Sequence, residues 1–214
     1  MKDKPSEISS FRRHGWVLTA KQARRLGMGS RRLRTLVAEG RADRVGRGFY
    51  RWRDADVTIN HGLALARRNV PGCVICLLSA LQFHELTTQL PFEVWIAINA
   101  GRKSPPRNRI VPLRVFKFSG PAFAEGIETH RIEGTAVQVY SVAKTIADIF
   151  KHRNKIGLDV ALEALREGWR KRRFRVDELM HYARVCRVAN IIRPYAEVVI
   201  QEWGRRTNPA DKRD

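Results

Sequence analysis

A group of arginines between residues 31 and 47 carries the most interpretable chemistry of this sequence. A guanidinium is planar, always charged and forked, and it fits both phosphate oxygens and the edge of guanine. We expect residues 30–35 to enter a major groove through Ser30, Thr35 and the three arginines between them. We expect Arg44 and Arg47 to contact the backbone or the minor groove. The candidate DNA-binding residues are Ser30, Arg31, Arg32, Arg34, Thr35, Arg44 and Arg47.

Side chains that could support catalysis are present but poorly spaced. Ser79 and His84 are five residues apart, about 500° around a helix, so they do not share a face. His84 and Thr87 are expected to form a local hydrogen bond at a helix end. Lys144 and Asp148, four residues apart, are expected to pair on the flank of a helix. We expect no enzymatic activity from these residues.

Metal chemistry is not indicated either. A metal-dependent nuclease needs converging acidic residues followed by a lysine, yet the strand-like segments 92–99 and 113–119 offer only Glu93. The chain has 3 cysteines. Cys73 and Cys76 form one CxxC within an apolar run, without a second pair at zinc-ribbon spacing, and are expected to be buried. We therefore expect no metal and no cofactor.

The elements that would position the arginines lie in residues 17–52. Thr19 followed by Gln22 is a capping box and predicts a helix start. Residues 27–29, Gly-Met-Gly, break that helix. Ser30 is expected to cap a second helix, and Gly40 to end it. This pattern is typical of a helix-turn-helix.

A basic hairpin follows the second helix. Residues 42–45 and 49–52 flank the turn 46–48, Gly-Arg-Gly, and predict two short strands. Arg51 and Arg53 beside this hairpin are also expected to contact phosphates. The segment therefore predicts a winged helix-turn-helix. The alternative is that these charges only form a solvated surface.

Composition supports a polyanionic partner. The formal net charge is +20 and the sequence pI is about 11.1, and residues 1–56 alone carry 15 Lys and Arg against 6 Asp and Glu. Such a basic domain is the expected footprint of nucleic-acid binding. The sequence lacks an apolar run of about 18 residues and an apolar signal segment, so we expect a cytoplasmic protein that does not enter a membrane.

The second domain is expected to cover residues 57–214, after a winged helix-turn-helix domain at 1–56. It should begin with helices at 58–69 and 73–86. Strands are expected at 92–99, 113–119, 127–132 and 135–140, the last two joined by a hairpin turn at Glu133-Gly134. We expect the fold class to be α+β, with a small, mainly antiparallel sheet and a helical C-terminal part.

That helical part shows clear start signals. Ser141 is a predicted N-cap, an apolar stripe covers residues 158–169, Asp177 is expected to cap a third helix, and a fourth is expected from about Pro194 to Gly204. Two basic clusters in this domain could extend a phosphate-binding surface, suit another partner or simply be solvated: Arg102, Lys103, Arg107, Arg109, Arg114 and Lys117; and Arg170, Lys171, Arg172, Arg173 and Arg175.

Several short motifs occur together in a recognisable order. They are Leu18-Thr19-Ala20, Gly46-Arg47-Gly48-Phe49-Tyr50, Leu78-Ser79-Ala80-Leu81 with His84 and Leu86-Thr87, Pro91 with Val94-Trp95, and Val139-Tyr140-Ser141 with Thr145-Ile146-Ala147-Asp148. In this order, over roughly residues 11–204, the sequence resembles the AbiEi-type antitoxins of bacterial type IV toxin-antitoxin systems.

The resemblance implies a function that the residues alone do not. It implies an N-terminal winged helix that binds inverted repeats of double-stranded DNA in its own promoter. It also implies a C-terminal domain that counters a nucleotidyltransferase-like toxin, without requiring direct contact with it. The alternative is an RNA-binding or degenerate nuclease-like accessory protein.

Overall fold

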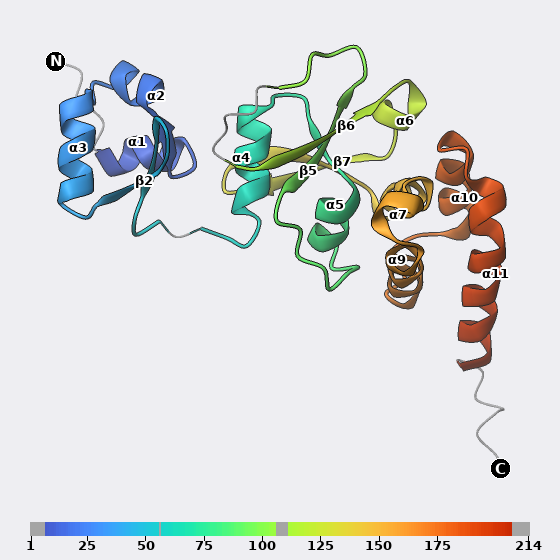
Figure 1. The fold of residues 1–214 in the computed structure, drawn as a ribbon. Coiled ribbons are helices and arrows are strands. Elements are labelled where there is room, and N and C mark those ends of the chain that lie inside the picture. Colours follow the sequence, from blue (N-terminus) through green and yellow to red (C-terminus); the bar gives the residue numbers. More distant parts are fainter. Residues whose placement is uncertain (1–6, 56, 106–110, 207–214) are drawn as a thin grey trace.

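Two separate sheets organise the chain in the computed structural model, which describes residues 7–55, 57–105 and 111–206, with side chains up to residue 201 (Figure 1). One sheet lies in the N-terminal part and the other in the remainder. One buried apolar cluster belongs to the first sheet and two belong to the second. The domain boundary between residues 56 and 57 stays a prediction, which this separation supports.

The N-terminal part has the element order of a winged helix-turn-helix. Its elements are α1 (Glu7–Arg13), β1 (Val17–Thr19), α2 (Ala20–Arg25), α3 (Ser30–Ala38), β2 (Ala42–Gly46) and β3 (Phe49–Trp52). The strands form an antiparallel sheet in the order β1-β3-β2. Helix α1 and strand β1 were not predicted, whereas the two following helices and the hairpin were.

Local signals set the limits of these helices. The Thr19 side chain accepts a hydrogen bond from the backbone of Gln22, and the Gln22 side chain accepts one in return from Thr19, as the capping box predicts. Gly40 ends α3 with a φ of 70°. The expectation for Ser30 was wrong by one residue. Gly29 is the N-cap of α3, without a side-chain bond, and Ser30 is the first helical residue.

The core of this part holds α3 against the other helices. Leu33 and Leu36 of α3 are buried together with Phe11 of α1, Ala23 of α2 and Trp52 of β3. Because Leu33 and Leu36 share one face, the opposite face of α3 is directed to solvent. In Figure 1, α3 lies at the outer end of the molecule, with α1 between it and the rest of the chain.

The remainder of the chain is an α+β unit, as expected. Its elements are α4 (His61–Asn69), β4 (Val74–Ile75), α5 (Leu77–Phe83), β5 (Val94–Asn99), β6 (Leu113–Phe118), α6 (Pro121–Ala124), β7 (Ile127–Ile132), β8 (Thr135–Tyr140), α7 (Val142–Lys151), α8 (Arg153–Ile156), α9 (Leu158–Arg170), α10 (Val176–Val185) and α11 (Ala189–Arg206).

The second sheet differs from expectation in strand direction. Its order is β6-β5-β4-β8-β7. The β5–β6 and β4–β8 pairs are parallel, and the β4–β5 and β7–β8 pairs are antiparallel. The sheet is therefore mixed rather than mainly antiparallel. The predicted hairpin at Glu133-Gly134 is present between β7 and β8, and both turn residues have positive φ values.

Both faces of this sheet are buried, because successive strand residues point to opposite sides. In β5, Trp95 and Ala97 belong to the cluster beneath α5 and α7, whereas Ile96 and Ile98 belong to the cluster beneath α4. Helix α4 covers one face, and α5 and α7 cover the other (Figure 1).

The expected single helix at 73–86 was wrong. Val74 and Ile75 form the central strand β4, and α5 begins only at Leu77. Val74 packs on one side of the sheet and Ile75 on the other. A strand buried on both faces reads as a continuous apolar run, so its periodicity does not distinguish it from a buried helix.

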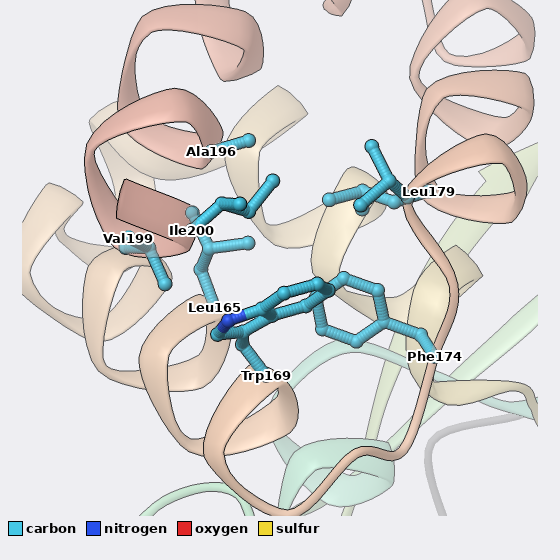
Figure 2. A pocket seen from close by; sticks show the side chains of 8 residues that line it. Leu165, Trp169, Phe174, Leu179, Ala196, Val199 and Ile200 are labelled. Carbon is cyan, nitrogen blue, oxygen red and sulfur yellow. The ribbon is translucent and has the colours of Figure 1, made fainter. Parts of the chain in front are cut away.

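Helices α9, α10 and α11 pack outside α7. Between them lies a small pocket whose lining is entirely apolar (Figure 2), formed by Leu165, Trp169, Phe174, Val176, Leu179, Ala196, Val199 and Ile200.

The expected starts of two of these helices were wrong. Arg175, not Asp177, is the N-cap of α10. Helix α11 begins at Ala189 and contains Pro194, because burial of Ile192 extends the helix upstream. Among the described helices, none is long and apolar enough to cross a membrane.

Candidate nucleic-acid interface

The outward face of α3 presents unpaired cations. Arg31 and Arg34 are exposed, and within the described residues neither side chain has a hydrogen-bond or carboxylate partner. Ser30 is exposed at the start of the same helix. The Thr35 hydroxyl donates to the Arg31 carbonyl at 3.1 Å, which leaves its oxygen lone pairs available. These four residues form one polar surface that can follow phosphates or base edges.

Arg32 has a different environment from its neighbours. It forms a two-pronged ion pair with Glu7 of α1, in which Nη2 lies 2.8 Å from Oε2, and a longer contact of 3.4 Å with Glu39. The hydrogen bond between Arg32 and Glu7 lowers the pKa of the Glu7 carboxyl and raises the pKa of the Arg32 guanidinium. Arg32 therefore ties α3 to α1, which places it in a positioning role.

The turn of the hairpin lies against the start of α2. The backbone amide of Ala20 donates to the Gly48 carbonyl at 2.8 Å. Gly48 has a φ of 78°, a conformation that favours glycine. Arg44 and Arg47 are both exposed, without a hydrogen-bond partner in the described part of the chain. The short wing thus carries two available guanidinium groups.

Arg51 and Arg53 are less available than the sequence suggests. Arg53 donates twice to Asp43, at 2.8 and 3.1 Å, and Arg51 lies 3.4 Å from the other oxygen of that carboxylate. These bonds lower the pKa of Asp43, with the Arg53 hydrogen bond as the largest cause. Asp43 therefore offsets part of the charge of Arg51 and Arg53.

Sequence reasoning missed the cations of α2. Lys21, Arg24 and Arg25 are exposed on this short helix, and the described residues provide no acidic partner for them. In a helix-turn-helix the first helix crosses the phosphate backbone while the second enters the groove. The signal was available, because all three residues lie away from the buried Ala23.

The residues considered for catalysis have structural partners. The Ser79 hydroxyl accepts a hydrogen bond from the Trp95 amide at 2.9 Å. His84 donates through Nε2 to the Tyr140 carbonyl at 2.7 Å, and burial lowers its pKa. The expected bond between His84 and Thr87 was wrong, because Thr87 instead contacts Glu163. Among the described residues, no group of three or more His, Cys, Asp and Glu could hold a metal ion.

The expected pairing of Lys144 with Asp148 is present, but the expected position of the pair was wrong. It lies in the core and not on a flank, with the two residues 0% and 1% exposed. Lys144 Nζ lies 2.6 Å from one Asp148 oxygen, and the Cys186 thiol donates to the other at 3.1 Å. Burial raises the pKa of Asp148, and the Lys144 ammonium opposes that shift. Helix α7 is enclosed by α5, α9 and α10, so this pair is not accessible to a substrate.

The two basic clusters of the second domain are partly occupied. Arg102 donates to the Pro71 carbonyl, and Lys171 to the Glu85 carbonyl. Two further arginines form ion pairs with neighbours in sequence: Arg170 with Glu167, and Arg175 with Asp177. Arg107 and Arg109 lie outside the described residues. No single surface follows from these clusters.

The element order of the N-terminal part and the outward cations of α3 fit a winged helix-turn-helix. The comparison with protein families agrees. Residues 6–51 match the family described as "Transcriptional regulator, AbiEi antitoxin". The match spans α1 to all but the last residue of β3, and it confirms the resemblance for the N-terminal region. No curated protein matches the chain.

Proposed function

We propose that this protein is a DNA-binding antitoxin that represses its own promoter and counters a nucleotidyltransferase-like toxin. The observation that carries the DNA-binding half is the outward face of α3. Arg31 and Arg34 are exposed there without carboxylate partners among the described residues, whereas Glu7, Glu39 and Asp43 are engaged by other arginines. The match of residues 6–51 to an antitoxin family supports the other half.

In this proposal the residues have distinct tasks. Ser30, Arg31, Arg34 and Thr35 enter the major groove of an inverted repeat, and Arg32 holds α3 against α1. Arg44 and Arg47 contact the backbone or the minor groove, and the α2 cations add phosphate contacts. The protein acts in the cytoplasm by binding rather than by catalysis, without metal or cofactor.

A gel-shift titration tests the DNA-binding half. The full chain is titrated against the DNA upstream of its own gene, with an unrelated duplex and a hairpin RNA as competitors. We expect preferential binding of the upstream duplex, and loss of that preference in the double variant R31A/R34A. The variant R131A, which removes an exposed charge from β7, is the matched control and should bind normally. Preference for the hairpin RNA would contradict the proposal.

Growth rescue tests the antitoxin half. The toxin candidate is a nucleotidyltransferase-like protein encoded beside this gene, and its induction should stop growth. Co-expression of the full chain should restore growth, both for the native sequence and for R31A/R34A, because neutralisation does not require the α3 cations. Failure of both proteins to rescue growth would refute the antitoxin assignment while leaving DNA binding intact.

A further inference from the structure

A cleft of about 410 Å³ separates the N-terminal elements from the second sheet. We call it the α1–α4 cleft, because the end of α1 and the start of α2 line one side, and α4 with the β7–β8 turn lines the other. None of the residues proposed to contact DNA lines this cleft, and α3 lies at the opposite side of the N-terminal part (Figure 1).

Arg68 of α4 is the most unusual side chain of this cleft. Its Nε donates to the Thr135 hydroxyl at 2.7 Å. Its Nη1 is buried and has no hydrogen-bond partner in the described structure. The guanidinium lies so close to Gly15 that a Cβ there would collide with it, and Gly15 has a φ of 68°. A buried donor without a partner carries a free-energy cost.

Within the described part of the chain, no carboxylate contacts the guanidinium of Arg68. Glu133 is the acid that acts on it through space, but Glu133 is bound by His61 at 2.7 Å and by the amide and hydroxyl of Thr58. Burial lowers the pKa of Arg68 and Glu133 opposes the shift. An anion beside Arg68 would therefore be favoured.

The opposite wall brings more positive charge to the cleft. Arg13 is exposed, and only its Nε is engaged, by the Ser9 carbonyl at 3.3 Å. His14 lies next to it, with Nδ1 2.9 Å from the Ser10 carbonyl. Of the described residues that line the cleft, none is acidic. Arginines from two walls thus line a common space that has no acidic residue among its described lining.

The rest of the lining is uncharged. Val17 and Leu65, which are 3% and 5% exposed, contribute small apolar edges, and Gln22 and Asn69 contribute amide groups. The Asn69 Nδ2 donates to the Leu65 carbonyl at 2.8 Å, which leaves its Oδ1 as an acceptor. Gln22 uses its Oε1 to bind Thr19, which leaves its NH₂ group available. The volume falls within the range of small-molecule sites, about 300–1,000 Å³.

We propose that the α1–α4 cleft binds a small phosphate-bearing ligand of mononucleotide size. Arg13 and Arg68 hold the phosphate, and the amides of Gln22 and Asn69 bind the uncharged part against Val17 and Leu65. This site is independent of the proposed antitoxin function. Because residues of both parts of the chain would hold the ligand, the ligand would link the two parts.

Calorimetric titration of the full chain tests this proposal, with AMP, GMP and inorganic phosphate as probes. We expect at least one mononucleotide to bind with one site per chain, and phosphate to bind at least tenfold more weakly. The double variant R13Q/R68Q should weaken nucleotide binding at least tenfold. The matched double variant R12Q/R131Q also removes one charge from each part and should change the Kd less than twofold.

A second variant addresses the cavity without removing charge. Asn69→Trp would fill the cleft and should abolish nucleotide binding, while thermal unfolding shows whether each variant is folded. Absence of binding by every probe at millimolar concentration, equal loss in the two double variants, or phosphate as tight as nucleotide would overturn the proposal. A DNA-binding measurement without added nucleotide provides a further check. If R13Q/R68Q binds DNA more weakly and R12Q/R131Q does not, the cleft is part of the DNA interface and the proposal is overturned.

Discussion

Three arginines of α3 differ in role because different groups lie within reach of each. Arg31 and Arg34 face solvent, whereas Arg32 reaches Glu7 on α1 and Glu39 at the end of its own helix. A guanidinium that already holds a carboxylate in two places has fewer donors left for DNA. Identical residues that lie close together in the sequence therefore divide into two exposed arginines, which we propose contact DNA, and one that holds α3 against α1.

Replacing Arg31 or Arg34 with Ala should weaken binding to the upstream operator by about 1–3 kcal/mol, the usual value of one good contact to a base. Preference at one base position should relax, because the lost donors face a single base pair. Gel shifts on a set of operator point mutants would measure both effects. Equal loss on operator and random DNA would show that these side chains contact only phosphate.

Arg32→Ala should affect stability rather than base preference. It removes the tie between α3 and α1, so the thermal unfolding temperature of the N-terminal part should fall while base preference is kept. The ion pair also predicts a pH dependence. The folded pKa of Glu7 is lowered, so this stabilisation is present above the ordinary glutamate value of about 4.3 and is lost as pH falls through the folded pKa.

Thermal unfolding of the native protein and Arg32→Ala between neutral pH and pH 3 would measure this dependence. The difference in unfolding temperature between the two proteins should become smaller as the pH falls. A constant difference would mean that Glu7 is not the partner that matters. Arg24→Ala, which removes an exposed charge without a carboxylate partner, is the matched control.

Which of these residue roles a sequence can reveal depends on chain distance. The Thr19–Gln22 capping box was predictable, because both partners lie within one helical turn. The Glu7–Arg32 pair joins residues 25 apart, through α1, which the sequence pattern did not reveal. Asp43 opposite Arg51 could have been found from the hairpin register, since the two residues face each other across β2 and β3.

At the scale of elements, the wing is too short to read many bases. We expect Arg47→Ala to lower affinity for all duplexes by a similar factor, because its guanidinium contacts phosphate. It should also flatten the plot of log affinity against log salt by about one unit. Arg53→Ala should have the smaller effect, since Arg53 already binds Asp43. An unchanged slope with lost preference at an A·T-rich flank would mean that Arg47 reads the minor groove.

Helix α7 shows how burial overrides a simple reading of polarity. Lys144 and Asp148 are polar and four apart, which suggests a solvated flank, yet neighbouring helices enclose them completely. Removing one partner leaves an uncompensated buried charge. Lys144→Met or Asp148→Leu alone should therefore lower the free energy of unfolding by about 3–5 kcal/mol.

The double variant K144M/D148L tests that explanation. Replacing both partners with apolar residues of similar volume should cost much less than the sum of the single changes, because no charge remains unpaired. Urea unfolding of the four proteins forms a double-mutant cycle. Additive losses would show that the two residues stabilise α7 independently.

Four of the five strands of the second sheet were predictable individually, but strand β4 and the arrangement of the sheet were not. Residues 127–132 and 135–140 are joined by two turn residues, so their antiparallel pairing could be read locally. The parallel pairing of β5 with β6 depends on the path of a long connection. The two-residue strand β4 is too short for any periodicity, yet it joins the two halves of the sheet.

For the whole molecule, the decisive feature is that the N-terminal part has a hydrophobic core of its own. Phe11, Leu33, Leu36 and Trp52 contribute to that core, and none of its members comes from the second sheet or the helices around it. The connecting segment is well exposed, with Ile59 86% accessible. A part with its own core and a solvated connection is able to fold alone.

A fragment that ends at Val57 should therefore fold and bind operator DNA. It contains α2, α3 and the wing, and a cooperative thermal transition would show that it is folded. Its affinity should be lower than that of the full chain if the second domain helps to pair adjacent half-sites. The same fragment should fail to restore growth when the toxin is expressed, because neutralisation is assigned to residues 57–214. Rescue by residues 1–57 alone would refute the division of function between the two parts.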